Sequence, residues 1–370
     1  MLLLVAVALL AGPLPRNLRG EPPGPSRRAG PVLAWASDDH LLIASNGLLA
    51  RFDLNSSKEE LLDDTVIAFA LHPQGKHLAV ATPEEVSLRS YPAFEWLAAL
   101  PLHEHGAAAV DTVQALAWSS GGETLAGGTA SGHVLLWDVE TGEPESGAPE
   151  SGELWADLEV SPAAAVTQLS FSSDGKRLLS VFEDARAVLW DLEKREEIQR
   201  FAPASAEASL DAASFGRAQD RRDKSAGRPA SAEDTPPTEA GAMLLSPDGR
   251  RLLHTWVRGE LATPAAGLAE MSLLDDAGRV LWRRAGVGVE FTPDGAAVLA
   301  LAPPYRVAAL YRVENAAALR VFEPSEGVER LLAVRLNPSG TRLAGVTESR
   351  LGQGLVVWDV PTGRILKTRH

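Results

Sequence analysis

The chain has 370 residues, of which 45% are hydrophobic and 23% are charged, so it can bury a large core and is not disordered as a whole. It contains no cysteine, which excludes disulfides, thiolate metal sites and cysteine nucleophiles. A formal net charge of −14 argues against binding nucleic acid through a basic surface.

The N-terminus combines a short apolar run at residues 1–12 with a Pro-, Gly- and Arg-rich stretch at residues 13–31. The run is too short to span a hydrocarbon core of ~30 Å and suits the apolar part of a signal peptide. The run lacks preceding basic residues and a clean cleavage site. Two alternative interpretations therefore stay open: a mis-assigned start codon, or the remnant of a longer membrane segment. We expect an extracytoplasmic or envelope location in preference to the cytoplasm, and a linker over residues 13–31.

A pattern of three apolar runs separated by turns recurs seven times from Val32 onwards. The average is about 48 residues per copy, close to the ~40–45-residue period of a propeller blade. Each run is short and bounded by turn residues, which predicts strands. The turn between the first two runs of each copy lies at Asp39, Gly75, Gly122, Gly175, Gly249, Gly295 and Gly340.

Turns such as Ser173-Asp174-Gly175 predict a hairpin, because the Asp side chain bonds its own backbone and Gly accepts a positive φ. Strands this short are not stable as isolated hairpins, but sheets arranged around an axis bury both of their faces. We therefore predict an all-β, seven-bladed propeller of four-stranded antiparallel blades over residues 32–370.

Three copies end their third run with Trp-Asp, at Trp137-Asp138, Trp190-Asp191 and Trp358-Asp359, and Phe52-Asp53 is a near match. With these residues the sequence resembles the WD-repeat β-propeller family, and its composition is typical of a bacterial protein. The three tryptophans are predicted to lie in the core.

Two departures from that family affect the expected packing. The Gly-His dipeptide that precedes the innermost strand in the family is absent, and the Asp before the third strand is mostly missing. We therefore expect no Asp-His-Ser-Trp network, and blades joined by packing rather than by polar contacts. We also expect the first and last blades to meet without exchanging a strand; the alternative is that the Pro-rich segment covers their junction.

Two insertions interrupt the repeat: an Ala-, Ser- and Pro-rich segment at 205–241 and an acidic segment at 140–153. Their composition favours a disordered insertion between the fourth and fifth blades and a solvated loop. No phosphate-binding loop, dinucleotide fingerprint, nucleophile elbow or zinc-protease helix is present. His103-Glu104-His105 is interpreted as a polar loop and not as a metal site. No cofactor is expected.

In the resembled fold, one face of the ring is built by loops between the second and third strands and between blades. Aromatic and arginine side chains are enriched in protein interfaces. Carried over to this sequence, the loops place the following candidates on that face: Phe182, Arg186, Trp256, Arg258, Tyr305, Arg306 and Arg350.

The leading hypothesis is a non-enzymatic, monomeric interaction scaffold for a protein or peptide, because catalytic motifs are missing and this face carries aromatic and arginine residues. A propeller hydrolase or oxidoreductase with a site at the channel mouth is an alternative. A third is a sensor domain of a membrane signalling protein, suggested by the apolar start. None of these predicts a membrane span within the propeller.

Overall fold

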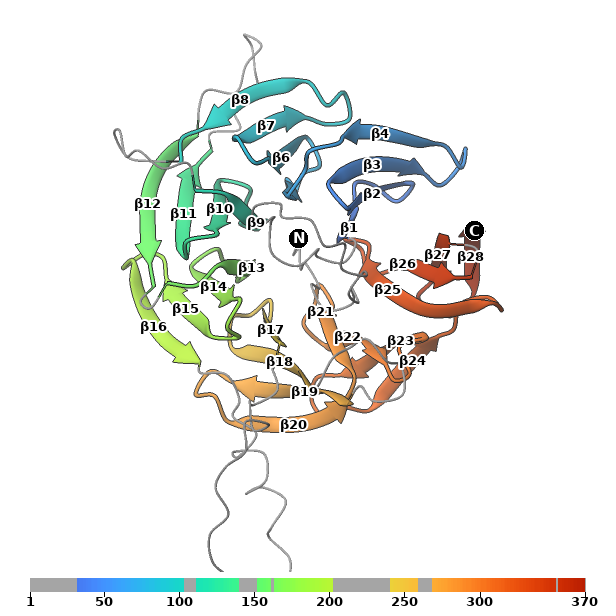
Figure 1. The fold of residues 1–370 in the computed structure, drawn as a ribbon. Coiled ribbons are helices and arrows are strands. Elements are labelled where there is room, and N and C mark those ends of the chain that lie inside the picture. The colour runs from blue at the N-terminus through green and yellow to red at the C-terminus, as the bar shows by residue number, and fades with distance from the viewer. Residues whose placement is uncertain are drawn as a thin grey trace, which may run out of the picture.

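The computed structural model describes residues 32–102, 111–139, 152–160, 163–201, 240–258, 268–350 and 352–369, with the backbone alone at 240, 241, 256–258 and 268. These residues form seven four-stranded antiparallel sheets arranged in a ring (Figure 1). All of the regular elements in the described ranges are strands. The predicted all-β, seven-bladed propeller is confirmed.

Each blade consists of four consecutive strands, and their bounds are as follows. Blades one to three contain β1 (Val32–Trp35), β2 (His40–Ser45), β3 (Leu48–Asp53), β4 (Glu59–Asp63), β5 (Ala68–Leu71), β6 (His77–Ala81), β7 (Val86–Ser90), β8 (Trp96–Leu100), β9 (Val113–Trp118), β10 (Thr124–Thr129), β11 (His133–Asp138) and β12 (Glu153–Glu159). Blades four and five contain β13 (Val166–Phe171), β14 (Arg177–Phe182), β15 (Ala187–Asp191), β16 (Glu196–Phe201), β17 (Ala240–Leu245), β18 (Arg251–Arg258), β19 (Leu268–Asp275) and β20 (Val280–Ala285). Blades six and seven contain β21 (Val287–Phe291), β22 (Ala297–Ala302), β23 (Val307–Arg312), β24 (Ala318–Phe322), β25 (Val328–Leu336), β26 (Arg342–Ser349), β27 (Gly352–Asp359) and β28 (Ile365–Arg369).

The first hairpin of each blade closes with the predicted turn chemistry. The six turn glycines have φ between +68° and +82°, a region that glycine adopts without steric cost. In blade four, the Asp174 carboxylate accepts hydrogen bonds from the Ser172 hydroxyl (2.6 Å) and the Lys176 N–H (3.0 Å). These hydrogen bonds stabilise the carboxylate and lower the pKa of Asp174. Asp248 and Asp294 repeat the arrangement in blades five and six.

The Trp-Asp pairs end the third strands, as predicted. Trp137, Trp190 and Trp358 are at most 5% exposed, which confirms that they belong to the core. Asp191 and Asp359 have a different role, because they cap the turn that leads to the outer strand. Asp191 accepts a hydrogen bond from the Lys194 N–H at 3.0 Å and Asp359 accepts one from the Thr362 N–H at 2.9 Å.

Polar contacts join neighbouring blades, so the expectation that packing alone would hold them is wrong. The indole N–H of Trp358 in blade seven donates to the Glu323 carbonyl after blade six at 2.9 Å, and the Gln168 amide in blade four donates to the Met243 carbonyl in blade five at 2.6 Å. Blade four contains one Ser–Trp hydrogen bond of the kind expected in the resembled family: the Trp190 indole N–H donates to the Ser180 hydroxyl at 2.9 Å.

A buried ion pair strengthens the contact between blades six and seven. The Arg335 guanidinium on β25 lies 3.3 Å from the Glu290 carboxylate on β21, and both side chains are less than 10% exposed. The other Glu290 oxygen accepts the Leu336 backbone N–H at 2.6 Å. Burial raises the pKa of Glu290, and the cation and the N–H donor oppose that rise.

The ring closes between blades seven and one without strand exchange, as predicted, because each of the two blades is a complete sheet of its own four strands. The indole N–H of Trp35 on β1 donates to the Arg335 carbonyl on β25 at 2.9 Å, and the Asn337 amide donates to the Asp38 carboxylate at 2.8 Å. Hydrogen bonds therefore assist side-chain packing at this junction.

Several of the sequence predictions concern residues outside the described ranges: the apolar start at 1–12, the linker at 13–31 with its alternative role at the junction, residues 205–239 of the insertion, and His103-Glu104-His105. Residues 140–151 of the acidic segment also lie outside them. Residues 240 and 241 of the insertion begin strand β17. Within the ranges that are described, no helix has the length and apolarity needed to cross a membrane.

Candidate functional site

One face of the ring, which we name the loop face, is formed by the connections between second and third strands and by those between blades. Backbone hydrogen bonds bring the two kinds of connection together. The Val66 N–H, before blade two, donates to the Gly47 carbonyl of blade one at 2.8 Å, and the Glu183 N–H of blade four donates to the Ala165 carbonyl at 2.8 Å. At these two places, a connection between second and third strands lies beside a connection between blades.

Phe182 and Arg186, at the loop face of blade four, belong to one local cluster. Phe182 is 1% exposed, and the Arg186 guanidinium lies 5.6 Å from the centre of its ring, within the range of a cation–π contact. Arg186 also pairs with the Asp184 carboxylate of the same turn. The arginine covers the ring, so Phe182 contributes packing and presents no surface to a partner.

Tyr305 is also buried, at 6% exposure, and it connects three blades. Its hydroxyl accepts the Ala269 N–H of blade five at 3.2 Å, and its carbonyl accepts the Leu331 N–H of blade seven at 2.9 Å. Burial raises the pKa of the phenol. Tyr305 has φ of +65°, so the loop of blade six is held in an uncommon conformation at the residue before Arg306.

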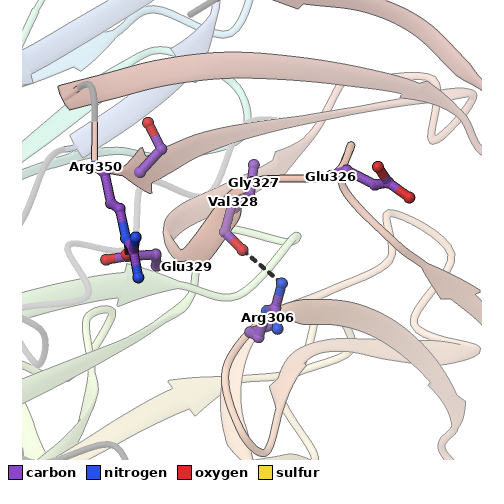
Figure 2. Close-up of a pocket in the computed structure, with 7 residues that line it drawn as sticks. Arg306, Glu326, Gly327, Val328, Glu329 and Arg350 are labelled. Carbon is purple, nitrogen blue, oxygen red and sulfur yellow. Dashed lines mark hydrogen bonds and ion pairs between the residues drawn. The ribbon is translucent and has the colours of Figure 1, made fainter.

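Arg306 and Arg350 line a cleft of about 750 Å³ between blades six and seven (Figure 2). The Arg306 guanidinium donates to the Val328 carbonyl at 2.8 Å. The Arg350 side chain is 92% exposed, and its Nε lies 3.2 Å from the Glu329 carboxylate. Glu326, Gly327 and Ser349 complete the lining. The structure thus brings two of the seven predicted residues into one concave site.

The remaining predicted residues lie elsewhere or are described only in part. Trp256 and Arg258 belong to β18 of blade five, and their side chains lie outside the described part of the structure. The acidic residues of the cleft, Glu326 and Glu329, were not predicted. They lie in and beside the connection between blades six and seven, where the acidic stretch Glu323-Pro-Ser-Glu-Gly-Val-Glu329 was the available signal.

The cleft combines two cations and two anions on exposed loops. The exposed Arg350–Glu329 pair contributes little to stability, because water screens it and both side chains lose freedom when they pair. Both groups can therefore exchange this contact for one with a partner at small cost. Among the described residues, no group of three or more His, Asp or Glu side chains could hold a metal ion.

Comparison with known proteins agrees with this architecture. The family "WD domain, G-beta repeat" matches residues 100–138 and 157–191, which contain most of blades three and four. These matches and the ring support a WD-repeat propeller. The β-propeller domain of Myceliophteria thermophila Cps50 (Swd1) is similar, with a TM-score of 0.57 and 15% identity, over 83% of this chain and 86% of that one. No curated protein matches the chain.

WD-repeat propellers typically act as scaffolds for protein interactions and are generally not enzymes. The similarity to the solved propeller domain is one of fold. The repeat matches cover most of blades three and four, whereas the cleft lies between blades six and seven. The matched repeats therefore do not include the residues that line the cleft.

Proposed function

We propose that this protein is a non-enzymatic interaction scaffold whose loop face receives a protein or peptide partner at the cleft between blades six and seven. The observation that carries the proposal is the concave lining by Arg306 and Arg350. Arginine is enriched among residues that dominate binding energy in interfaces. The uncommon backbone at Tyr305 and its contacts with blades five and seven fix the loop of Arg306 before a partner arrives.

The charge pattern indicates how a partner would bind. Arg350 and Glu329 are close together in Figure 2, while Arg306 lies apart from them, against the Val328 carbonyl. A peptide with both acidic and basic side chains would complement these groups better than a ligand of one sign. Because the charged groups are exposed, they would mainly set specificity and association rate.

Affinity capture with the tagged full chain from its source cells tests this proposal. We compare the wild type, Arg306→Ala/Arg350→Ala, Arg350→Glu alone, and the control Arg312→Ala, an exposed arginine at the end of β23 on the other face. We expect at least one partner to be lost about tenfold or more in both cleft variants and retained by the control. Retention of every partner by both cleft variants would exclude the cleft as the binding site.

A further inference from the structure

The wall of the ring is formed by the outer strand of each blade, and every outer strand contains a β-bulge. In blade seven, Val357 pairs with Lys367 and Trp358 with Ile365, which leaves Leu366 as the extra residue. The extra residue is apolar in all seven blades: Leu62, Leu97, Trp155, Ile198, Leu281, Leu319 and Leu366. The bulge therefore adds one large apolar side chain to the outer strand of each blade, at an equivalent position in blades two to seven and at a different position, opposite Leu49 and Ala50, in blade one.

These seven side chains do not share one environment. Leu62, Leu97 and Trp155, in blades one to three, are partly buried and pack against the core. In blades four to seven, Ile198, Leu281, Leu319 and Leu366 are 45%, 51%, 43% and 55% exposed. On the strands of the three leucines, further exposed apolar residues accompany them, namely Val280, Val321 and Ile365.

The wall is also divided by charge. The outer strands of blades five to seven, β20, β24 and β28, carry five basic residues and no acidic one: Arg283, Arg284, Arg320, Lys367 and Arg369. We name these three strands the basic wall. The outer strands β4 of blade one and β12 of blade three carry six acidic residues and no basic one: Glu59, Glu60, Asp63, Glu153, Asp157 and Glu159. A basic surface that is also apolar is unexpected in a chain of net charge −14.

Some of the cations have structural contacts, and others do not. The Arg284 guanidinium lies 4.3 Å from the centre of the Tyr311 ring in the next blade, and Arg369 pairs with Glu59 of blade one at 3.0 Å. Lys367 and the exposed Arg364, which precedes β28, form no ion pair with any described residue. The positive charge beside Leu366 is therefore free to act on a partner.

We propose that the basic wall binds an acidic polypeptide segment with apolar side chains, which runs along the wall across blades five to seven. Charge complementarity selects an acidic partner, and the three exposed leucines provide apolar anchors. The bulge interrupts the regular ladder of the edge strand, so side chains and not strand addition make the contact. A chain can follow the convex wall seen in Figure 1, whereas a flat membrane would touch it along one line.

Phage display of random 16-residue peptides on the immobilised full-length protein tests the proposal. The variant Leu281→Ser/Leu319→Ser/Leu366→Ser removes the anchors, and Arg364→Glu/Lys367→Glu reverses the free charges. The control Leu61→Ser/Trp96→Ser removes two apolar side chains of 59% and 54% exposure from the outer strands of blades one and two. The altered side chains are exposed, except that of Lys367, which is partly buried. Circular dichroism with thermal unfolding establishes that each variant folds.

We expect the enriched peptides to be acidic and rich in large apolar residues. The synthesised peptides should bind at least tenfold more weakly to the leucine and charge variants, and with unchanged affinity to the control and to Arg306→Ala/Arg350→Ala. Enrichment of neutral or basic peptides, no enrichment, or equal loss in the control would overturn the proposal. Sedimentation with phosphatidylserine vesicles that depends on the same three leucines would assign the wall to a membrane and would also overturn it.

Discussion

The Trp358 side chain fills the interior of blade seven and also bonds to the connection that precedes it. It is fully buried, its ring centre lies 6.1 Å from that of Phe322, and its indole N–H reaches the Glu323 carbonyl. Trp358→Ala should reduce the free energy of unfolding by ~3–5 kcal/mol, because it removes a large apolar side chain and leaves a cavity. Trp358→Phe should cost less than the alanine variant. Urea unfolding measures both, and a loss below about 1 kcal/mol for the alanine variant would contradict the assignment.

His254 makes the stability of blade five sensitive to acid. Burial lowers its pKa from 6.5 to about 4, because the site disfavours the charged ring. The unfolded chain therefore takes up a proton at higher pH than the folded protein does. Stability from this residue is complete above pH ~6.5, falls as the pH decreases towards ~4, and is constant below that.

The loss should amount to about 3 kcal/mol between pH 7 and pH 4. We expect His254→Leu to remove this part of the pH dependence in urea unfolding measured at intervals from pH 7 to pH 4. A wild type and a variant with parallel profiles over that range would show that the folded protein accommodates the protonated ring.

The sequence predicted which side chains are buried in the core better than it predicted which side chains are accessible on the loop face. The Trp-Asp pairs fixed the register of the third strands, so the burial of the tryptophans followed. Phe182 and Tyr305 were assigned to the correct loops, but a loop position does not determine whether an aromatic ring points outwards. The Arg186 side chain covers one ring, and the Ala269 N–H attracts the hydroxyl of the other inwards.

Contacts between elements are where polar residues contribute to the ring. Removing one member of the buried Glu290–Arg335 pair leaves the other without its partner in a site that water does not reach. Arg335→Leu should therefore destabilise the protein by ~3–5 kcal/mol. The double variant Glu290→Leu/Arg335→Leu should recover most of this loss, because no buried charge then remains. Urea unfolding of the two variants tests this, and equal destabilisation by the single and double changes would show that the pair is not coupled.

Turns and strands were predictable because their chemistry is local, whereas contacts between blades were not. Glu290 and Arg335 lie on different blades, 45 positions apart in the sequence, and each is flanked by apolar residues in its strand. Nothing within either strand indicates the other residue as its partner. The bulges were missed for a similar reason, because the extra residue in each outer strand is another apolar residue and does not disturb the pattern.

At the scale of the whole molecule, the number of turns determined the number of blades, and the completeness of each copy predicted closure without exchange. The distribution of charge was not predictable from the net value. Acidic residues dominate the chain, yet basic residues gather on the outer strands of blades five to seven and acidic residues on those of blades one and three. The separation appears only when the fourth strands of distant copies are compared.

The junction between blades seven and one has a mechanical consequence. Every other pair of neighbouring blades is also joined by a covalent connection, whereas within the described residues this pair relies on contacts such as Trp35 with Arg335 and Asn337 with Asp38. If the ring is strained by heat, denaturant or tension, this is the junction that can part while the backbone stays intact. The circle then opens into an arc at a defined place, and its two end blades are exposed before any other blade is.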